Sequence, residues 1–323
     1  MNAIALEHAG RVYKTTTGFV RRHKKEISAV VDLSFEVAQG ELFGMLGPNG
    51  AGKTTTIKML TTLLRPTSGK VSVAGLDVAR DAAKIRPLIG FAFGGERGLY
   101  YRLNGRDNLR YFAELYRLPP RKINTRVEEL LELVRLRERA DERVEGYSRG
   151  MKQRLHLART LLHDPNILFL DEPTIGLDPV GARELRETIR QLHERGKTIL
   201  LTTHYMFEAD ALCDRIVVIG KGRLLASGTP RELKSLVRDQ SVVELEVFGA
   251  TPEVIDRLRA LDFVDSVVVE QRDLRQVLRV QTPIAEQAVP RLIGSLAGLE
   301  VGRVSVREAT LEDAYVRLVE RTE

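Results

Sequence analysis

The stretch that decides the fold is a glycine-rich loop, Gly47-Pro48-Asn49-Gly50-Ala51-Gly52-Lys53-Thr54. Its spacing matches G-x-x-x-x-G-K-[ST], a pattern in which backbone N–H groups curl around phosphate oxygens. In this pattern the lysine, here Lys53, reaches the β and γ phosphates, and the hydroxyl of Thr54 binds Mg²⁺. The loop therefore predicts a binding site for a nucleoside polyphosphate with magnesium.

The segments on either side of this phosphate loop support the same interpretation. Residues 41–46 have the apolar composition of a buried strand, and residues 55–64 have the pattern of a helix that ends before Pro66. The N-terminus of such a helix favours an anion because its N–H groups and dipole point at the ligand. We therefore expect the nucleotide to contact the loop and the residue after it, namely Gly47, Pro48, Asn49, Gly50, Ala51, Gly52, Lys53, Thr54 and Thr55.

The composition is that of an ordinary globular protein with room for more than one domain. The 323 residues are 43% hydrophobic and 29% charged, and no apolar run approaches the roughly 20 residues that cross a bilayer. With no secretory signal pattern at its start, the chain is expected in the cytoplasm, where it could still dock on a membrane. Its single cysteine, Cys213, is expected to be a core or spacer thiol.

The charge is divided unevenly along the chain, which suggests a domain boundary near residues 230–240. The net charge is +6, yet residues 241–323 hold 10 Arg against 15 Asp plus Glu, and no lysine follows Lys234. The basic first part suits an anionic nucleotide, whereas the acidic tail argues against a continuous nucleic-acid-binding face. We expect domains at 1–235 and 240–323 and no nucleic-acid partner.

The first part of the chain predicts an α/β domain with an inserted helical region. Alternating and apolar strands are expected in its first 75 residues, helices dominate about 98–160, and buried strands resume at 166–170, 198–202 and 215–219. A basic stretch within 21–25 is expected to be a solvated loop, with a lipid or partner contact as the alternative.

The tail predicts a different arrangement. Strands and helices alternate there in the order βαββαβ, which is the ferredoxin-like order, and an amphipathic helix at 311–318 follows. This accessory domain shows no catalytic grouping of residues.

Two carboxylates follow the strand at 166–170. Asp171 and Glu172 would lie at its carboxyl end, where open α/β sheets bind their ligands. We expect Asp171 to support the Mg²⁺ that Thr54 holds, and Glu172 to polarise the water that attacks the γ-phosphate.

At this point residues 1–230 resemble the ATP-binding subunits of ABC transporters. The segment 147–153, Tyr-Ser-Arg-Gly-Met-Lys-Gln, is similar to the family's signature loop, although Tyr147, Arg149 and Met151 depart from the usual L-S-G-G-Q. The segment 176–179, Gly-Leu-Asp-Pro, resembles the D-loop, which contains Asp178. His204 matches the switch histidine that senses the γ-phosphate, and Tyr13 lies where an aromatic residue stacks on adenine.

The resemblance implies the fold of a P-loop NTPase: an ABC cassette with a RecA-like core and a helical subdomain. It also implies a dimer of ATPase subunits, either two identical copies or a pair of different chains. Each ATP would lie between the phosphate loop of one subunit and Ser148 and Gly150 of the other. An integral membrane permease, encoded separately, would use closing and opening of this dimer for export, which places the ATPase on the cytoplasmic face of the membrane.

One position departs from the family in a way that affects coupling. The glutamine expected between the core and the helical subdomain aligns with Gly95, which has no side chain to contact Mg²⁺ or water. Compensation by Glu96 or Arg97 is a hypothesis. Segments 104–109, 147–153 and 310–315 look most like the drug-resistance and ABC-2-type exporters.

Two other functions fit the same motifs. A soluble ABC ATPase of translation or DNA repair would usually have two cassettes or a long coiled coil, and this chain has one cassette without sustained heptads. A nucleotide-dependent regulator without hydrolysis would not need Glu172 and His204.

Overall fold

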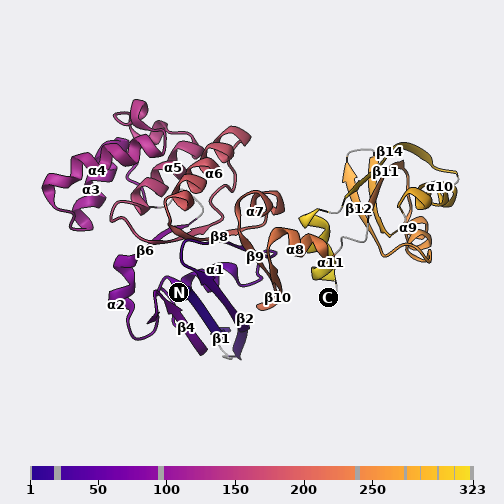
Figure 1. Cartoon of the computed structure of the whole chain (residues 1–323), viewed down its shortest axis with the longest axis horizontal. Coiled ribbons are helices and arrows are strands. Elements are labelled where there is room, and N and C mark those ends of the chain that lie inside the picture. Colours follow the sequence, from indigo (N-terminus) through magenta and orange to yellow (C-terminus); the bar gives the residue numbers. More distant parts are fainter. Residues whose placement is uncertain are drawn as a thin grey trace. The chain divides into compact units, whose positions relative to one another are not determined.

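A computed structural model describes residues 2–17, 23–93, 98–236, 241–272, 275–283, 285–296, 298–308 and 310–320. Contacts between Cα atoms divide the chain into two compact units, Met1–Thr229 and Pro230–Glu323 (Figure 1). Among the described residues, no helix has the length and apolar character needed to cross a membrane.

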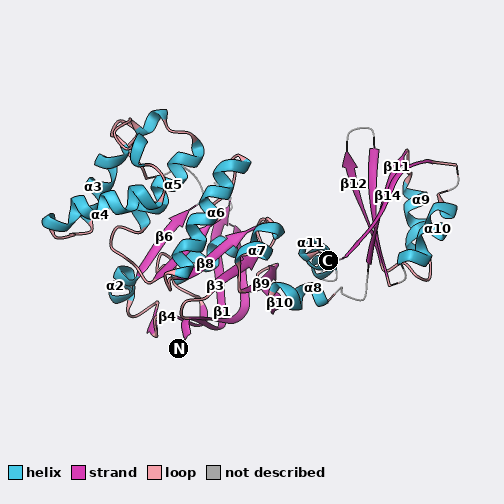
Figure 2. Ribbon diagram, turned by 45° about the horizontal axis from the view of Figure 1, so that its top comes forward, coloured by secondary structure: helices cyan, strands magenta, loops and turns pink. Residues whose placement is uncertain are grey.

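The first unit is built around a six-stranded sheet that is parallel except at one edge. From edge to edge its strands are β10 (Arg223–Gly228), β9 (Arg215–Gly220), β3 (Leu42–Leu46), β8 (Thr198–Thr203), β7 (Ile167–Asp171) and β6 (Ile89–Phe93). Figure 2 shows these strands side by side. The residues of β3, β7 and β8 are all buried, as expected for a parallel sheet covered on both faces. The carboxyl ends of these three strands therefore meet at one edge of the sheet.

A second, antiparallel sheet completes the core of this unit. Its strands are β2 (His23–Ala38), β1 (Asn2–Thr17), β4 (Ser68–Val73) and β5 (Leu76–Asp77). The sequence interpretation of the basic stretch as a loop is wrong for His23, Lys24 and Lys25, because they pair with β1 in a long hairpin. The remaining residues of that stretch fall within 18–22, outside the described part of the chain.

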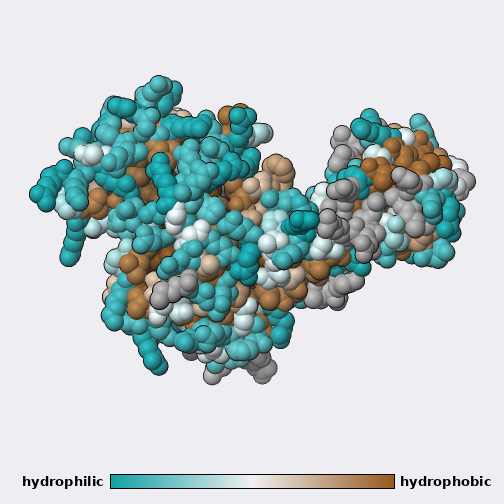
Figure 3. Space-filling model, viewed as in Figure 1, coloured by the Kyte–Doolittle hydropathy of each residue, from teal (hydrophilic) through white to brown (hydrophobic). Residues whose placement is uncertain are grey.

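Helices α3 (Gly105–Leu115), α4 (Pro120–Leu133) and α5 (Arg149–Thr160) form the inserted helical subdomain, as predicted. They follow β6 and precede β7, and Figure 1 shows them gathered together. Helices α3 and α4 are amphipathic: Leu109, Val127 and Leu131 are buried, while the visible surface over these two helices is largely hydrophilic (Figure 3). Tyr147, at the first position of the signature loop, is also buried, and its hydroxyl donates to the carbonyl of Arg139 at 2.6 Å.

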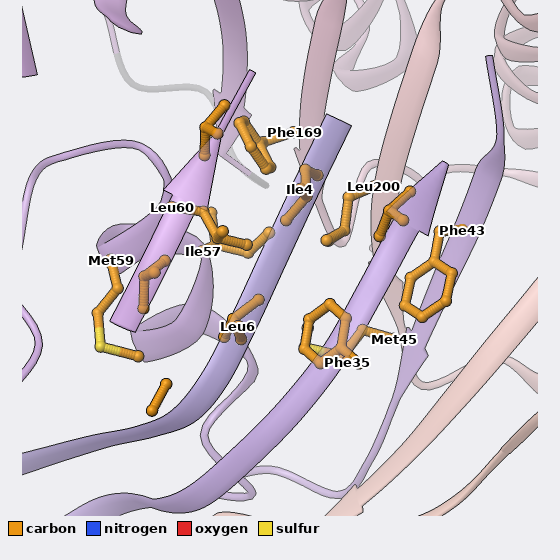
Figure 4. Packing of buried hydrophobic residues seen from close by; sticks show 14 of the residues in the cluster. Ile4, Leu6, Phe35, Phe43, Met45, Ile57, Met59, Leu60, Phe169 and Leu200 are labelled. Carbon is orange, nitrogen blue, oxygen red and sulfur yellow. The ribbon is translucent and has the colours of Figure 1, made fainter. Parts of the chain in front are cut away.

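The main hydrophobic core lies between the two sheets and α1 (Lys53–Leu60) (Figure 4). Ile4 and Leu6 of β1 pack there with Ile57 and Leu60 of the helix. The helix was predicted to extend to residue 64, but it ends four residues earlier because Thr62 has a left-handed backbone, with φ +62°. This core fixes α1, and with it the phosphate loop, against β3.

Two helices follow the strands that were predicted to bear functional residues. Helix α6 (Pro179–Glu194) lies between β7 and β8, and α7 (Met206–Leu212) lies between β8 and β9. Cys213 follows α7 and is buried, as predicted, and a side chain at Gly44 would collide with its sulfur. Burial raises the pKa of this thiol.

The second unit has the predicted βαββαβ order. Its elements are α8 (Pro230–Ser235), β11 (Ser241–Phe248), α9 (Pro252–Arg259), β12 (Ser266–Arg272), β13 (Arg275–Thr282), α10 (Ala285–Ser295), β14 (Glu300–Glu308) and α11 (Leu311–Glu320). The strands pair antiparallel in the order β12-β13-β11-β14. Helices α9 and α10 cover one face of this sheet (Figure 2), where Val243, Leu245, Leu258 and Leu292 form the core.

Candidate nucleotide site

The phosphate loop connects β3 to α1, and its backbone depends on glycine at two positions. Gly52 immediately precedes α1 with φ +105°, and a side chain there would lie 2.6 Å from the carbonyl of Ala29. At Gly47 a side chain would lie 2.5 Å from the carbonyl of Ile219. No side chain caps α1 and no acidic residue occupies its first turn, so the first N–H groups of the helix can meet an anion.

Lys53 places its ammonium group inside this loop. Its Nζ donates to the carbonyl of Gly47 at 2.6 Å and to that of Pro48 at 3.2 Å, and the residue is 5% exposed. The same Nζ lies 3.5 Å from Oε1 of Glu172. The cation expected from the motif therefore faces both the loop and the expected general base.

Thr54 and Asp171, the two expected magnesium ligands, are in direct contact. The hydroxyl of Thr54 donates to Oδ2 of Asp171 at 3.1 Å. Hydroxyl and carboxylate oxygens are hard donors that suit Mg²⁺, which usually takes one or two protein ligands and completes its shell with phosphate and water. The described residues contain no group of three or more His, Cys, Asp or Glu that could hold a metal alone. The donor set therefore fits a magnesium ion that arrives with a nucleotide.

Glu172 and His204 are also brought together. Oε2 of Glu172 lies 3.4 Å from Nδ1 of His204, a charge contact in which that nitrogen makes no hydrogen bond within the described chain. The backbone of Glu172 has φ +49°, an unfavourable value for a residue with a side chain. Its N–H donates to both the carbonyl and the hydroxyl of Thr202 at 3.0 Å, which holds this conformation.

Thr202 is a functional residue that the sequence reasoning missed. Besides accepting from the N–H of Glu172, its hydroxyl donates to Oδ1 of Asp171 at 2.5 Å. Both carboxylate-bearing residues are thus fixed by one side chain from the neighbouring strand β8. A hydroxyl at the carboxyl end of β8 is visible in the sequence, but Thr203 shares this feature, so the pattern alone does not single out Thr202.

The signature-loop residues lie at the start of α5. Ser148 is the N-cap of this helix and accepts from the N–H of Met151 at 3.2 Å. A side chain at Gly150 would find its nearest neighbour, Cα of Gly181, at 3.7 Å, which is ordinary contact. Nothing in its own chain therefore requires glycine at this position.

Ser148 and Gly150 are not brought to the phosphate loop of their own chain. Within the described residues, neither hydrogen-bonds to any part of 47–54. The signature loop is instead tied to the segment before α6, because Nη1 of Arg149 donates to the carbonyl of Gly176 at 3.3 Å. In the described part of the chain, the signature loop therefore contacts the segment before α6, and neither Ser148 nor Gly150 hydrogen-bonds to the phosphate loop.

Asp178 has a role in its own chain that its motif did not suggest. It is the N-cap of α6, and its carboxylate accepts from the N–H groups of Gly181 at 2.9 Å and Val180 at 3.0 Å. These backbone hydrogen bonds hold the pKa of Asp178 below its ordinary value. The carboxylate therefore stays ionised at the N-terminus of the helix.

Tyr13, the expected adenine-stacking residue, lies on the long hairpin. It pairs with Ile27 of β2, and the guanidinium of Arg11 lies 5.0 Å from the centre of its ring. Gly95, Glu96 and Arg97, which carry the hypothesis of a compensated glutamine position, lie outside the described residues.

Comparisons with known proteins agree with this geometry. The family model described as ABC transporter matches residues 30–175. The linearmycin resistance ATP-binding protein LnrL of Bacillus subtilis is 36% identical over 91% of this chain and 94% of its own length. The Nod factor export ATP-binding protein I of a Rhizobium species is 39% identical over 99% of both chains. The daunorubicin resistance ATP-binding protein DrrA3 of Streptomyces coeruleorubidus is 39% identical over 94% of this chain and 95% of its own length.

Solved structures resemble the first unit. A dimeric, post-hydrolysis state of the ATP-binding cassette MJ0796 with ADP and phosphate has a TM-score of 0.62 and 25% identity, covering 70% of this chain and 98% of its own. The protein cbiO1 of Clostridium perfringens, part of the transporter complex cbiONQ, has a TM-score of 0.63 and 26% identity, with coverage of 73% and 93%.

Proposed function

This chain belongs to the ABC transporter family, and we propose that it is the ATP-binding and ATP-hydrolysing subunit of an exporter whose permease is a separate membrane protein. Relatives that match nearly the whole chain, tail included, are named for drug resistance and for Nod factor export. Because these matches extend over nearly the full length of the chain, they favour an exporter over a soluble ATPase of translation or DNA repair. They also favour it over a regulator that does not hydrolyse ATP.

The proposal rests on two side-chain contacts near the carboxyl ends of adjacent strands. Thr54 meets Asp171, and Glu172 meets His204 within 3.4 Å. Lys53 and the loop amides would bind the β and γ phosphates. Glu172 would accept the proton of the attacking water, and His204 would position that carboxylate and the γ-phosphate.

We assign Mg²⁺ binding to Thr54 and Asp171 because of their direct contact and their oxygen donors. A bound magnesium ion would neutralise charge on the β and γ phosphates. In this assignment Thr202 keeps Asp171 oriented toward the phosphate loop through its 2.5 Å hydrogen bond.

The other half of the site would come from a second ATPase subunit. Within the described residues, Ser148 and Gly150 make no hydrogen bond to the phosphate loop of their own chain, and a Cβ atom at Gly150 would make only ordinary contacts there. Both features suit closing on the γ-phosphate bound by another copy, with Asp178 near the same interface and Tyr13 at the adenine. The partner can be an identical copy or a related ATPase chain.

This function places the chain in the cytoplasm, against the inner face of the membrane that holds the permease. The cassette would extend to about residue 235, and residues 240–323 would form an accessory domain. That domain would not take part in the chemistry, because none of the site residues comes from it.

The test is the substitution Glu172→Gln. It removes the general base while keeping the size of the side chain, so we expect retained ATP binding and a fall in turnover of about 10²- to 10⁴-fold. Turnover would be measured as phosphate release, and binding with a fluorescent ATP analogue. Glu187→Gln, an exposed position of α6 paired with Arg190, is the matched control and should leave both unchanged. Undiminished turnover in Glu172→Gln would refute its role.

A second experiment separates the exporter from the other functions. The chain should be recovered with membranes only when the permease encoded beside it is co-expressed. Recovery from the soluble fraction in both conditions would contradict the transporter assignment.

A further inference from the structure

Glu208 is a buried carboxylate that has no assigned role in the nucleotide site described above. It lies in the first turn of α7 and is 1% exposed. Its Oε2 accepts a hydrogen bond from the hydroxyl of Thr174 at 3.0 Å. Its Oε1 makes no hydrogen bond within the described chain and lies 4.0 Å from Nη1 of Arg186 on α6.

Glu208 connects the segment after β7 to α7, the helix that follows His204. Its hydrogen-bond partner Thr174 lies two residues after Glu172, and Glu208 itself lies four residues after His204. The hydroxyl of Thr203, which immediately precedes His204, acts to lower the pKa of Glu208. Both threonines are buried. A single carboxylate on α7 therefore ties the segment that follows Glu172 to the helix that follows His204.

Such a carboxylate is a poor choice if the position serves packing alone. Burial of an incompletely paired carboxyl group costs free energy, which an apolar side chain of similar size would avoid. Burial indeed raises the pKa of Glu208, although the two hydroxyl groups and Arg186 act against that rise. What the carboxylate offers, and an apolar residue does not, is an acceptor for the hydroxyl group of Thr174.

The two segments that Glu208 joins need to be held at a set distance. Oε2 of Glu172 and Nδ1 of His204 lie 3.4 Å apart without a hydrogen bond between them, so this contact alone does not lock their separation. Thr202 fixes the backbone of Glu172, but within the described residues it makes no hydrogen bond to the segment that follows Glu172. Thr174 is the next hydroxyl group outward from Glu172, and it donates to Glu208, which lies four residues after His204.

We propose that Glu208 is a positioning residue for ATP hydrolysis, which sets the separation of Glu172 and His204 by holding Thr174 against the first turn of α7. The inference rests on the proposed roles of Glu172 and His204. It assigns Glu208 no contact with ATP, so its loss should act on the chemical step and leave nucleotide affinity alone.

The experiment compares Glu208→Ala and Glu208→Gln in the full chain. Glu208→Ala should lower kcat on the order of 10- to 100-fold with an unchanged KM for ATP, because a displacement of about 1 Å can cost that much. Glu208→Gln should keep most of the wild-type kcat, since its side-chain carbonyl can still accept from the hydroxyl of Thr174. A role in packing alone predicts instead that both variants lose thermal stability and keep the kcat of whatever fraction is folded.

A double-mutant cycle with His204→Ala gives the decisive readout. If Glu208 acts through the histidine, the double variant should be no slower than His204→Ala alone, whereas independent effects would multiply. Multiplying effects, or a folded Glu208→Ala variant with wild-type kcat, would overturn the inference. Thermal unfolding of each variant checks that it is folded.

The control variants separate this inference from the proposed function. Glu187→Ala, an exposed acid on α6, should match the wild type. If Glu172→Gln loses turnover and Glu208→Ala does not, only the positioning role fails. If Glu172→Gln also keeps its turnover, the assignment of the site itself fails.

Discussion

Thr202 joins the two carboxylates of the site through one hydroxyl group. It donates to Asp171 at 2.5 Å and accepts from the N–H of Glu172 at 3.0 Å. Because the β-hydroxyl and the strand that carries it are both buried, these bonds have no competition from solvent. The orientation of Asp171 and the left-handed backbone of Glu172 therefore depend on one side chain.

Replacing this residue tests that dependence. Thr202→Val keeps the shape but leaves an oxygen of Asp171 without its donor, which should lower the unfolding free energy by about 1–3 kcal/mol. It should also reduce kcat, because Asp171 and Glu172 lose their alignment. Urea unfolding and phosphate release measure the two effects, and Thr202→Ser, which keeps the hydroxyl, is the control. Equal behaviour of the Val and Ser variants would contradict this role.

The residues that the sequence identified are those whose function follows from a local pattern. Lys53 and Thr54 follow from the spacing of one loop, and Asp171 and Glu172 from two acids after an apolar strand. Thr202 and Glu208 act through neighbours more than 30 residues away in the chain. Their roles depend on which strands are adjacent in the sheet, and no local pattern contains that information.

At the scale of elements, α11 illustrates how a short motif fixes a whole helix. Its first residues were singled out in the sequence without a physical account. In the structure, Asp313 accepts from the N–H of Thr310 at 2.7 Å and from Arg307 of β14 at 2.6 and 3.1 Å. Glu312 meets Arg279 of β13 at 3.1 Å. The motif is therefore a helix cap that also ties α11 to the sheet of the second unit.

This predicts a pH-dependent helix. Burial acts to raise the pKa of Asp313, but the hydrogen bonds from Arg307 and Thr310 outweigh it and hold that pKa below its ordinary value. A depressed pKa means that the stabilisation is present above about pH 4, the unfolded value, and is lost as the pH falls through the folded value. We therefore expect amide exchange in α11, measured relative to its intrinsic rate at each pH, to accelerate in acid.

The substitution Asp313→Asn should produce the same acceleration at neutral pH and remove most of its dependence on pH. The loss should be about 1.5–3 kcal/mol, as for hydrogen bonds to charged groups. Glu312→Gln, at a more exposed ion pair, is the matched control and should have a smaller effect. Exchange rates in α11 that do not differ among the three proteins would contradict the proposed anchoring.

Sequence patterns placed most elements correctly but not always their ends. Within the region predicted to be helical, α4 begins at Pro120, because proline suits the first turn of a helix, and it ends at Leu133. Helix α1 ends at Leu60, where the hydroxyl of Thr61 donates to the carbonyl of Ile57 at 2.8 Å. These ends depend on individual side-chain and backbone contacts, whereas the periodic pattern extends past them.

At the scale of the whole molecule, the first unit carries two halves of a site that do not meet within it. The arrangement implies that chains with complementary defects can repair one another. Lys53→Ala damages the phosphate loop and leaves the signature loop intact. Gly150→Asp does the reverse, and the Cβ atom that it adds would make only ordinary contacts in its own fold.

Each variant alone should therefore lack ATPase activity, and an equimolar mixture should regain part of it. In a mixed dimer, one site combines the intact phosphate loop of the Gly150→Asp chain with the intact signature loop of the Lys53→Ala chain. Phosphate release from the mixture measures this, and a mixture of Lys53→Ala with Glu172→Gln, which leaves no intact site, is the control. Absence of recovery would argue against pairing of identical chains.

The order of strands in the central sheet could not be obtained from the sequence. The prediction identified apolar strands one after another, but β3 lies between β8 and β9, far from its neighbours in the chain. That order follows from packing over the whole unit and from the crossover helices between strands. It is also what makes β3, β7 and β8 present their functional residues together.

The buried thiol of Cys213 makes this chain a convenient background for site-specific labelling. It is the only cysteine in 323 residues, it packs against Gly44, and burial keeps its pKa raised, so maleimides should modify the folded protein slowly. A cysteine introduced at Val180, which is 67% exposed beside Asp178, would accept a fluorophore or spin probe almost exclusively. Closing of the ATPase pair could then be followed spectroscopically, without first removing any natural residue.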